Sequence, residues 1–437
     1  MSLAQKIVDH AARVGVIGLG YVGLPLAVTA ARAGYPVTGF DVDAGKMIRL
    51  DAGSSYIEAV SDADLAAVAG GFDWTTDFSR LSGCDVIVIC VPTPLTRHRE
   101  PDLSYVEQTA RTIAAHMTPD TLVILESTTF PGTTDLILRP ILAESGLEAG
   151  RDFFLGFSPE REDPGNTRYR TKSIPKVVSG DGEAAGDLVE RFYANVVEEV
   201  VRVSSTSVAE AVKITENIFR SVNIALVNEL KVVFHAMGID VHEVLDAAAT
   251  KPFGFMKFTP GPGLGGHCIP IDPFYLTWKA RQYEQNTRFI ELAGEVNTDM
   301  PRYVLRRTIE ALNAHKKSVN GSRILLVGLA YKPDVDDDRE SPTYKLMDFY
   351  KEMGAEVSYY DPFVPVIKPS REHGHWAGTA SVAWDRDTIS GFDAVVISTN
   401  HSEVDYDQLA VWTECVIDTR NAMNGREGIR EGQVWKS

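Results

Sequence analysis

Short apolar runs alternate with helix-like segments in the first part of the chain. The runs at 13–18, 36–41, 85–91 and 121–126 have the length of buried strands, and helical patterns lie between them at 21–33 and 105–116. Short buried strands that alternate with helices are typical of a parallel sheet covered by helices on both faces. The first part of the chain is therefore predicted to be a doubly wound α/β domain.

A weaker copy of this pattern occupies the last part of the chain. Strand-length runs lie at 323–330, 356–361, 393–399 and 415–418, and a helix is predicted at 344–353. The order of strand, glycine turn, helix and strand ending in Asp repeats that of the first part. We therefore expect an α/β fold with two Rossmann-like, doubly wound parallel-sheet domains joined by a long central helix.

The long central helix is predicted at 207–237. Ser207 and Glu210 have the spacing of a capping box, and Gly238 marks the stop. Apolar residues cover most faces of this pattern, as expected for a buried helix that joins two domains. A further helix is predicted from Pro301 to Ala314, followed by a polar linker into the last domain.

The composition and net charge of the chain argue against some classes of binding partner. The chain has 437 residues and a formal net charge of -17, which argues against nucleic acid or an anionic membrane surface as a main partner. No run reaches the ~18 to 20 apolar residues that span a bilayer, and charged residues interrupt the N-terminus where a signal peptide would lie. The four cysteines lack the spacing of a zinc site or a disulfide framework, which favours a reduced cytoplasm and no bound metal.

A glycine-rich turn follows the first predicted strand. Gly18, Gly20 and Gly23 form a GxGxxG motif that opens a helix, and Asp41 ends the second strand 18 residues after Gly23. These glycines permit the tight turn, the approach of a pyrophosphate and close packing of helix on strand, while the helix N-terminus attracts phosphate. A carboxylate at Asp41 favours NAD over NADP because it repels a 2′-phosphate. We therefore predict an NAD site; a purely structural turn is the alternative.

One cysteine stands out by its position. Cys268 directly follows the glycine-rich segment PGPGLGGH at 260–267 and lies outside any apolar run. Flanking glycines bring the backbone close to a ligand, so a nucleophilic thiol that captures an aldehyde as a thiohemiacetal is predicted. A small buried side chain is the alternative, because free cysteines are often buried. The neighbouring His267 is assigned a structural role.

Two polar side chains share one face of the central helix. Lys213 and Asn217 are four residues apart, and an ammonium and a carboxamide aimed at one point could stabilise a developing alkoxide. A lysine that reaches the surface is the alternative. Asp272, four residues past Cys268, could pair with Lys213, orient water or only cap a turn. A hydride acceptor, a thiol and an oxyanion-stabilising pair are together the parts needed to oxidise an alcohol past the aldehyde.

A series of motifs matches a known family in sequence order. They are GLGYVGLP at 18–25, VPTP at 91–94, EST at 126–128, PGTT at 131–134, SPER at 158–161, AEAVKITENIFRSVNIALVNE at 209–229, PGPGLGGHC at 260–268 and GLAYKPDVDDDRESP at 328–342. From about residue 13 to 420 the chain resembles the nucleotide-sugar 6-dehydrogenases, the group of UDP-glucose and UDP-N-acetylhexosamine dehydrogenases. The resemblance implies a four-electron oxidation at C6 of the sugar through a cysteine thiohemiacetal and thioester, with two NAD reduced per substrate.

The resemblance also implies roles for residues that match the family's motifs. Among the catalytic residues, Cys268 is the nucleophile, Lys213 and Asn217 stabilise the oxyanion, Asp272 and Thr128 hold the catalytic water, and Glu160 is a candidate general base. The implied cofactor residues are Gly18, Gly20, Tyr21, Val22, Gly23, Asp41, Lys46, Pro92, Thr93, Thr128 and Arg339. The implied substrate residues are Glu160, Arg161, Lys213, Asn217, Lys257, Phe258, Thr259, Pro260, Gly261, Gly265 and Lys332. Arg339 comes from the last domain and is expected to close the cleft over NAD.

The same resemblance implies how the chain is divided. An NAD-binding Rossmann domain is expected at 1–204, a central helical dimerisation and active-site domain at 205–315, and a C-terminal Rossmann-like domain that binds the UDP-sugar at 316–437. A homodimer or higher homo-oligomer is expected because the central helices of the family pair.

Departures from the UDP-glucose pattern bear on the substrate. Residues 158–161 read Ser-Pro-Glu-Arg where UDP-glucose enzymes typically have Asn-Pro-Glu-Phe, Gly-Gly-His-Cys replaces Gly-Gly-Ser-Cys, and Ile271 stands where a lysine often follows the cysteine. These variants look like the branch that acts on UDP-N-acetylglucosamine, whose uronic acid enters surface polysaccharide, and this is the predicted substrate. UDP-N-acetylmannosamine and UDP-glucose are the alternatives. More distant alternatives are a two-electron hydroxyacid dehydrogenase of the 6-phosphogluconate type and an inactive NAD-binding scaffold, neither of which needs the thiol.

Overall fold

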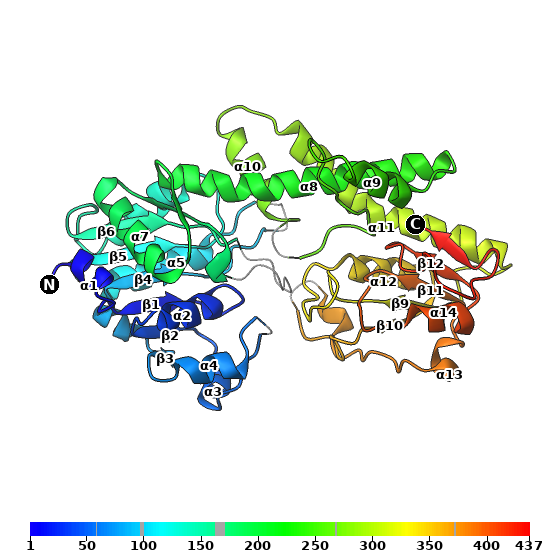
Figure 1. Cartoon of the computed structure of the whole chain (residues 1–437), viewed down its shortest axis with the longest axis horizontal. Helices are drawn as coiled ribbons and strands as arrows, with labels where there is room; N and C mark the ends of the chain where they lie inside the picture. The colour runs from blue at the N-terminus through cyan, green and yellow to red at the C-terminus, as the bar shows by residue number, and fades with distance from the viewer. Residues whose placement is uncertain (58, 97–99, 162–170, 267–268, 371–372) are drawn as a thin grey trace. The chain divides into compact units, whose positions relative to one another are not determined.

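The chain folds into two compact units (Figure 1). The computed structural model describes residues 1–57, 59–96, 100–161, 171–266, 269–370 and 373–437. Unit 1 comprises Met1–Glu216 and Phe274–Asn286, and unit 2 comprises Asn217–Pro273 and Thr287–Ser437. Over these described ranges, no helix is long and apolar enough to cross a membrane.

Unit 1 is built on an eight-stranded sheet in the order β3-β2-β1-β4-β5-β6-β7-β8. Its neighbouring strands are parallel except for β6 and β7, which are antiparallel. The strands are β1 (Val14–Ile17), β2 (Val37–Phe40), β3 (Phe72–Thr75), β4 (Val86–Ile89), β5 (Thr121–Leu125), β6 (Phe153–Phe157), β7 (Lys176–Gly180) and β8 (Val200–Arg202). The sequence pattern predicted β1, β2, β4 and β5, and the structure confirms them.

Helices cover both faces of this sheet because alternate strand residues point to opposite sides. In β4, Val86 and Val88 pack in one hydrophobic cluster with residues of α2 (Gly23–Arg32) and α7 (Glu183–Val196). Ile87 and Ile89 pack in a second cluster with α5 (Ser104–His116). The remaining helical segments before α8 are α1 (Leu3–Val8), α3 (Ala44–Asp51), α4 (Asp62–Val68), η1 (Phe78–Gly83), η2 (Thr134–Leu138), α6 (Arg139–Ala143) and η3 (Thr171–Ser173).

Unit 2 contains a five-stranded parallel sheet in the order β10-β9-β11-β12-β13. Its strands are β9 (Arg323–Val327), β10 (Glu356–Tyr360), β11 (Ala394–Ile397), β12 (Val416–Asp418) and β13 (Val434–Lys436). The helical segments beside them are α12 (Pro342–Glu352), η4 (Gly374–Trp376), α13 (Arg386–Ile389) and α14 (Tyr406–Trp412). Ile324 and Leu326 of β9 pack in a cluster with α12, whereas Leu325 and Val327 pack in another with α14. The second Rossmann-like half predicted from the sequence is therefore confirmed.

Four further helices are described. They are α8 (Thr206–Ala236), α9 (Val241–Ala249), α10 (Asp272–Arg281) and α11 (Arg288–Ala314). Of these, α8 carries the predicted site residues Lys213 and Asn217, and α10 carries Asp272. The predicted long central helix corresponds to α8, and Gly238 follows it with φ +73° as the stop requires.

Two local predictions for these helices are wrong. Glu210 does not form a capping box with Ser207, because its carboxylate accepts hydrogen bonds from the backbone N–H groups of Gly132 at 2.5 Å and Thr134 at 2.9 Å. Pro301 lies inside α11 instead of starting it. The buried face of α11 continues on both sides of Pro301 through Ala293 and Val304, so packing outweighs the cost of about 3 kcal/mol for an interior proline.

The prediction that the central helix is buried holds only for one of its faces. Asn217, Asn228 and Lys231 are buried, whereas Leu226 is 51% and Met237 62% exposed. Part of the apolar pattern of α8 therefore faces outward in the single chain.

Candidate functional site

The turn between β1 and α2 has the geometry of a phosphate cradle. Gly18 has φ +91°, and a Cβ there would lie 2.6 Å from the carbonyl oxygen of Cys90; a Cβ on Gly23 would overlap the carbonyl oxygen of Gly18. Only glycine fits these two places. A Cβ on Gly20 meets nothing within 4 Å, so the space over the middle glycine is open. Val22, the N-cap of α2, makes no side-chain cap hydrogen bond, which leaves the first N–H groups without a side-chain acceptor. These features fit a bound pyrophosphate.

Asp41 lies at the end of β2 beside this turn, as predicted. Its Oδ2 accepts hydrogen bonds from the N–H of Leu19 at 2.8 Å and from Nζ of Lys46 at 2.6 Å. The hydroxyl of Tyr56 donates to the carbonyl of Leu19 at 2.7 Å, and burial, followed by the charges of Asp41 and its neighbour Asp43, raises the pKa of Tyr56. The structure therefore groups Asp41 and Lys46 at the turn and adds Tyr56, which no sequence motif marks.

The segments that follow β4 and β5 are joined at the same edge of the sheet. Oγ1 of Thr93 donates to the carbonyl of Thr128 at 2.7 Å, and Oγ of Ser127 donates to the carbonyl of Val91 at 2.7 Å. The hydroxyl of Tyr275 in α10 donates to the carbonyl of Thr93. Because carboxyl ends of parallel strands form the ligand-binding edge of such sheets, the predicted Thr93 and Thr128 lie at a suitable place for a cofactor.

Lys213 is buried against the segment that follows β6. The residue is 7% exposed, and its ammonium donates to the backbone carbonyl of Glu160. The neighbouring Arg161 pairs with Glu216 of α8 at 2.6 Å and donates to the carbonyl of Pro175 at 2.6 Å. Unit 1 therefore brings together three predicted residues, Glu160, Arg161 and Lys213, and the surface alternative for Lys213 does not hold.

Asn217 and Asp272 form a buried pair in unit 2. Nδ2 of Asn217 donates to Oδ2 of Asp272 at 2.6 Å, and each residue is 3% exposed. Asp272 is the first residue of α10. The predicted nucleophile Cys268 and its neighbour His267 lie outside the described residues.

The predicted sugar loop is anchored to α8 through Gly261. Its N–H donates to Oδ1 of Asn228 at 2.9 Å, and its carbonyl accepts from Nζ of Lys231 at 2.9 Å. Asn228 in turn bonds Asn297 of α11 at 3.0 Å. These buried amides were missed from the sequence, although polar residues within the apolar pattern of a central helix are a usable signal.

The same loop packs on the motif after β9. A Cβ on Gly265 would lie 2.6 Å from Cβ of Tyr331, and the N–H of Gly266 donates to the carbonyl of Arg339 at 3.2 Å. The guanidinium of Arg339 binds both carboxylate oxygens of Asp337, at 2.8 and 2.7 Å. Unit 2 thus joins the two motifs predicted to hold the nucleotide sugar.

Two other predicted loop residues, Lys257 and Thr259, are exposed in unit 2. Lys257 pairs with Asp246, and their side chains are 41% and 62% exposed. The ring of Phe258 lies edge-on to that of Phe219, with centroids 5.8 Å apart. Thr259 is exposed and Pro260 is buried.

Two cations near the loop were missed from the sequence. Lys231 is 4% exposed and lies 5.3 Å from the ring centroid of Tyr303; burial, followed by the charge of Arg420, lowers the pKa of Lys231 to about 7. Arg420 is half-buried. It donates from Nε to the carbonyl of Ser398 at 2.7 Å, and its partial burial lowers its pKa to about 10. A buried and a half-buried cation next to a glycine loop are suited to an anionic ligand. The place of Arg420 just after β12 was the available signal.

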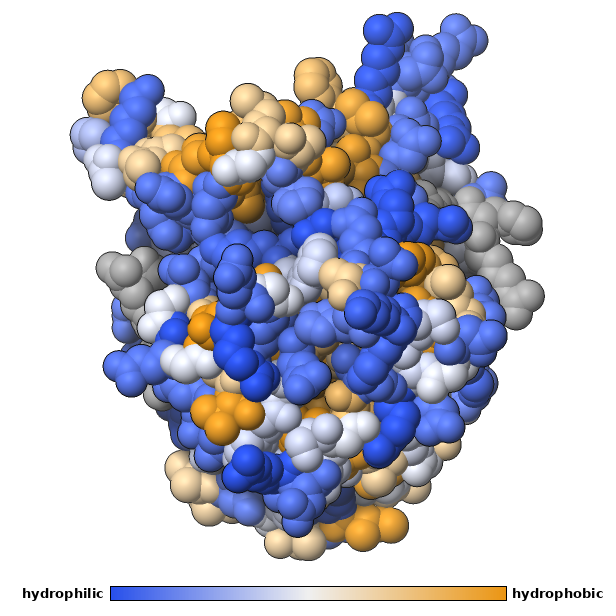
Figure 2. Space-filling model, turned by 90° about the vertical axis from the view of Figure 1, so that its right-hand side faces the viewer, coloured by the Kyte–Doolittle hydropathy of each residue, from blue (hydrophilic) through white to orange (hydrophobic). Residues whose placement is uncertain are grey.

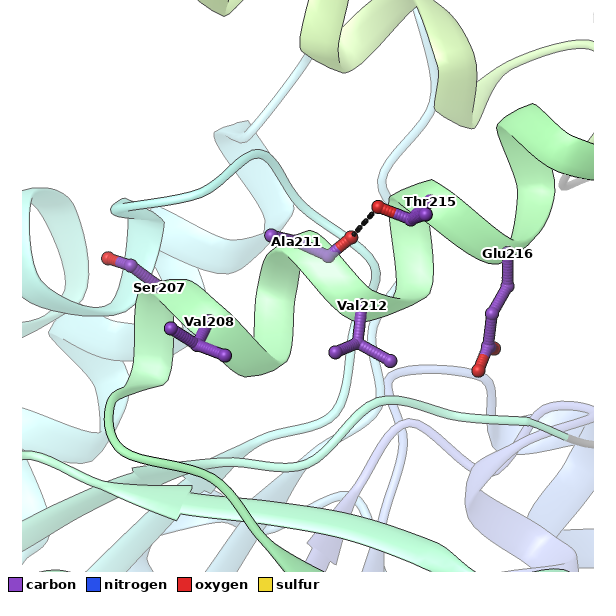
Figure 3. Close-up of a pocket in the computed structure, with 6 residues that line it drawn as sticks. All are labelled: Ser207, Val208, Ala211, Val212, Thr215 and Glu216. Carbon is purple, nitrogen blue, oxygen red and sulfur yellow. Dashed lines mark hydrogen bonds between the residues drawn. The ribbon is translucent and has the colours of Figure 1, made fainter.

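A pocket of about 440 Å³ lies along the first turns of α8 (Figure 3). Val208, Val212 and Glu216 extend from the same side of the helix, and Oγ1 of Thr215 donates to the carbonyl of Ala211 at 2.8 Å. The lining is mostly apolar and comes from one helix. It contains none of the predicted site residues, so we do not assign a ligand to it. Within the described part of the chain, no group of three or more His, Cys, Asp or Glu residues could hold a metal ion.

Comparison with known proteins finds three domain models of one family that match successive parts of the chain. The NAD binding domain of the UDP-glucose/GDP-mannose dehydrogenase family matches residues 12–197, its central domain matches 207–299, and its UDP binding domain matches 325–425.

Individual relatives extend over almost the whole length. The chain is 37% identical over 394 residues to a UDP-N-acetyl-D-glucosamine 6-dehydrogenase of Pseudomonas aeruginosa, covering 90% of this chain and 91% of that protein. It is 35% identical over 417 residues to a UDP-N-acetyl-D-mannosamine dehydrogenase of Pyrococcus horikoshii, covering 94% and 95%. The solved structure of a UDP-D-ManNAc dehydrogenase from Pyrococcus horikoshii superimposes with a TM-score of 0.87 at 33% identity, covering 97% of this chain and 98% of that chain.

The cradle between β1 and α2 and the anchored loop of unit 2 thus occur in a chain that matches all three domains of one enzyme family. The protein is an NAD-dependent nucleotide-sugar dehydrogenase, and it belongs to the UDP-glucose/GDP-mannose dehydrogenase family.

Proposed function

We propose that the enzyme oxidises the C6 hydroxyl of UDP-N-acetylglucosamine to the carboxylate, releasing two NADH per sugar. The observation that carries this proposal is the pairing of four predicted catalytic residues. Lys213 is bonded to Glu160, and Asn217 is bonded to Asp272, in each case with a buried side chain from α8. Such pairing holds the polar groups in place before the reaction, so that they can stabilise the charge of the transition state.

The first half of the reaction needs a base, an oxyanion site and a thiol. NAD, when bound at the Gly18 turn, supplies the hydride acceptor for each oxidation. The C6 hydroxyl gives its proton to the water that Thr128 and Asp272 hold as the hydride passes to NAD, and Lys213 and Asn217 stabilise the negative charge that develops on oxygen. The sulfur of Cys268 then adds to the aldehyde carbon while the thiol proton passes to the carbonyl oxygen. The resulting thiohemiacetal loses a second hydride to NAD and its hydroxyl proton to the same water, which gives the thioester.

The second half is hydrolysis. Thr128 and Asp272 hold the water, and Glu160 accepts one of its protons as the oxygen attacks the thioester carbonyl. The carbon–sulfur bond breaks, which frees Cys268 and the uronic acid.

Local cations offset the net negative charge of the protein at the nucleotide. We assign the diphosphate to Lys332 and to the pair Lys231 and Arg420, because the latter two lie beside Gly261 in the predicted sugar loop. The remaining proposed contacts to substrate come from Arg161, Lys257, Phe258, Thr259, Pro260 and Gly265. Those to NAD come from Tyr21, Val22, Asp41, Lys46, Pro92, Thr93 and Arg339.

The choice of UDP-N-acetylglucosamine is supported by the residues Ser-Pro-Glu-Arg at 158–161 and by the relative from Pseudomonas aeruginosa. The mannosamine dehydrogenase of Pyrococcus horikoshii is almost as similar, so UDP-N-acetylmannosamine is the second candidate. The test compares kcat/KM for UDP-N-acetylglucosamine, UDP-N-acetylmannosamine and UDP-glucose on one preparation. A preference for either of the other two sugars contradicts the proposed substrate.

The chemical route is tested by stoichiometry and by one substitution. We expect two NADH per uronic acid, whereas one NADH contradicts the thioester route and fits a two-electron dehydrogenase. Cys268→Ser should retain NAD binding and form no acid, and the exposed-surface variant Ser402→Ala serves as the control. Acid formation at the wild-type rate by Cys268→Ser excludes the thiol as nucleophile.

We also propose that the enzyme is a homodimer built on the helices of unit 2. Apolar side chains gather near the top of the view in Figure 2, and large apolar residues on or next to these helices are exposed, namely Phe219, Leu226, Val232 and Val233 on α8, Met237 just after it, and Phe289 and Leu292 on α11. Light scattering on the purified protein should give the mass of two chains, and Leu226→Glu should lower it.

A further inference from the structure

A buried charged cluster lies at the carboxyl edge of the unit 1 sheet. Glu126 directly follows β5, Glu160 follows β6, and Lys176 begins β7. Because β7 runs antiparallel to β6, its first residue lies at the edge where β5 and β6 end. Nζ of Lys176 is 3.0 Å from Oε1 of Glu126 and 3.9 Å from Oε2 of Glu160. One ammonium therefore lies between two carboxylates.

The far side of this cluster is fixed by α7. Tyr193 is fully buried, and its hydroxyl donates to Oε1 of Glu126. The ammonium of Lys176 also lies 5.2 Å from the centroid of the Tyr193 ring. Glu126 is itself 0% exposed. Lys176 therefore contacts one fully buried carboxylate, that of Glu126, in addition to that of Glu160.

The charges of the cluster depend on one another. Burial, partly offset by Lys176, raises the pKa of Glu126. Burial works against a charge on Lys176, but the carboxylates of Glu126 and Glu160 outweigh it and raise the pKa of Lys176. The ammonium is therefore retained, and removal of one partner would leave an uncompensated buried charge.

Glu160 is the point where this cluster meets the reaction. Its backbone carbonyl is bonded to Lys213 and its carboxylate faces Lys176. The backbone carbonyl of Glu160 thus orients Lys213, the oxyanion-stabilising lysine. The side chain of Glu160 contacts a second lysine, Lys176. The EST motif at 126–128 contains Glu126, but no motif indicated a role of this kind for Lys176, Glu126 or Tyr193.

We infer that Lys176 is a positioning residue that holds the Glu160 carboxylate for hydrolysis of the thioester, and that Glu126 and Tyr193 hold Lys176. The inference rests on the proposed function, which assigns Glu160 as the base. In that step the water oxygen forms the new bond to the acyl carbon, and the carbon–sulfur bond breaks with its electron pair on Cys268. Glu160 takes one proton of the water, and the remaining acid proton passes to sulfur or solvent.

The test uses the full-length enzyme and separates hydrolysis from hydride transfer. Lys176→Met should lower kcat about 100-fold, the order of a lost general base, and should lower KM with it, because kcat/KM depends on the oxidation steps that precede hydrolysis. Because hydrolysis follows both oxidations, rapid mixing should still show a burst of two NADH per active site. Intact-mass measurement should then show an acyl-enzyme, and Lys176→Arg should restore most of the turnover.

A matched variant and a double variant test for a merely structural role. Lys6→Met removes a lysine–carboxylate pair of 2.6 Å with Asp85, at the opposite edge of the same sheet, and should turn over like wild type. Lys176→Met/Glu126→Gln removes both buried charges and should stay folded by circular dichroism yet accumulate acyl-enzyme.

Three outcomes would overturn the inference. They are wild-type turnover by Lys176→Met, recovery of turnover in the double variant, and loss of the NADH burst together with hydrolysis. The last two would show that Lys176 only supports the fold. If wild type forms no acid from any UDP-sugar, it is the proposed function that fails; if wild type forms acid with two NADH, these outcomes concern Lys176 alone.

Discussion

The two units of the molecule contain the same turn in different surroundings. Gly18 in unit 1 and Gly328 in unit 2 each follow a central strand, with φ of +91° and +89°. In each unit an aspartate at the end of the neighbouring strand accepts the N–H of the residue after that glycine, Asp41 at 2.8 Å and Asp361 at 2.6 Å. The local sequence therefore builds one turn twice.

The segment after the turn differs between the units. In unit 1 the helix α2 begins at Gly23 and leaves open space over Gly20. In unit 2 the helix α12 begins only at Pro342, and Ala330 stands at the place of the middle glycine. His401, fully buried, donates from Nε2 to Asp361 at 3.0 Å and accepts the N–H of Asp334 at Nδ1. A phosphate cradle needs the helix start and the open space as well as the turn, and only unit 1 provides them.

The two units also differ in the sign of the charge that a buried titratable group carries when it is ionised. Unit 1 buries the carboxyl of Glu210, and burial raises its pKa to about 7. Unit 2 buries the ammonium of Lys231, and burial lowers its pKa to about 7. Because the two groups carry opposite charges, they should change the free energy of unfolding with pH in opposite directions.

The largest expected effect is the pH dependence that Lys231 gives to unit 2. Between its folded pKa of about 7 and its unfolded value of 10.5, the unfolded chain binds more protons than the folded one. Stability therefore rises with pH through this window, by at most about 5 kcal/mol, and is flat below it. The measurement compares urea unfolding of wild type and Lys231→Met from pH 6 to 10. The variant should lack the rise, while Lys251→Met, an exposed lysine over a phenylalanine ring, should retain it.

The next effect concerns the filled turn. Asp361→Ala leaves four backbone N–H groups and His401 without their acceptor, so the free energy of unfolding should fall by about 4 kcal/mol. NAD affinity, measured by calorimetry, should not change. Asp41→Ala is the matched variant, which should lose less stability and weaken NAD binding by at least about tenfold. Equal effects of the two variants on NAD affinity would contradict the division of roles between the turns.

A smaller pH effect of opposite sign is expected from Glu210. Its folded pKa of about 7 exceeds the unfolded value of 4.5, so the folded chain binds more protons between these values. Stability therefore falls as pH rises through this window, by at most about 3 kcal/mol. Glu210→Gln should flatten the slope in urea unfolding from pH 4.5 to 7.5. Glu229→Gln, exposed on the same helix, should leave it unchanged; a slope that persists in Glu210→Gln assigns it to other groups.

The smallest effect concerns the open turn. Gly20→Val adds a side chain where nothing lies within 4 Å, so the protein should fold normally. The side chain occupies the space needed by the pyrophosphate and should weaken NAD binding about 30-fold, or about 2 kcal/mol. Calorimetric titration with NAD measures this, and Ala330→Val in the second turn should leave NAD affinity as in wild type. An unchanged affinity in Gly20→Val would mean that NAD does not cross this turn.

The GxGxxG turn and the strands β1, β2, β4, β5 and β9 to β12 could be predicted from the sequence because their signals are local. Alternating buried strands and helices, a glycine at a positive φ and an aspartate at a strand end depend on residues close in the chain. Three features were not predicted: the π-helical segment η2, the antiparallel strand β7 and the interior position of Pro301. Burial of a helix face and pairing of distant strands decide them.

The candidate site divides in the same way. The sequence determined which residue types are present for the reaction, including Lys213, Asn217, Asp272 and the glycine loop. It did not determine the partners of those residues: that Lys213 bonds a backbone carbonyl, that Asn217 bonds Asp272, or that Lys231 and Arg420 lie beside Gly261.

Only the tertiary structure decided these partners, because a hydrogen bond or a buried charge depends on which distant segments meet and on how much water they exclude. Lys176 shows this most clearly. No role for Lys176 was predicted from the sequence, and only the antiparallel pairing of β7 with β6 brings its ammonium near both Glu126 and Glu160.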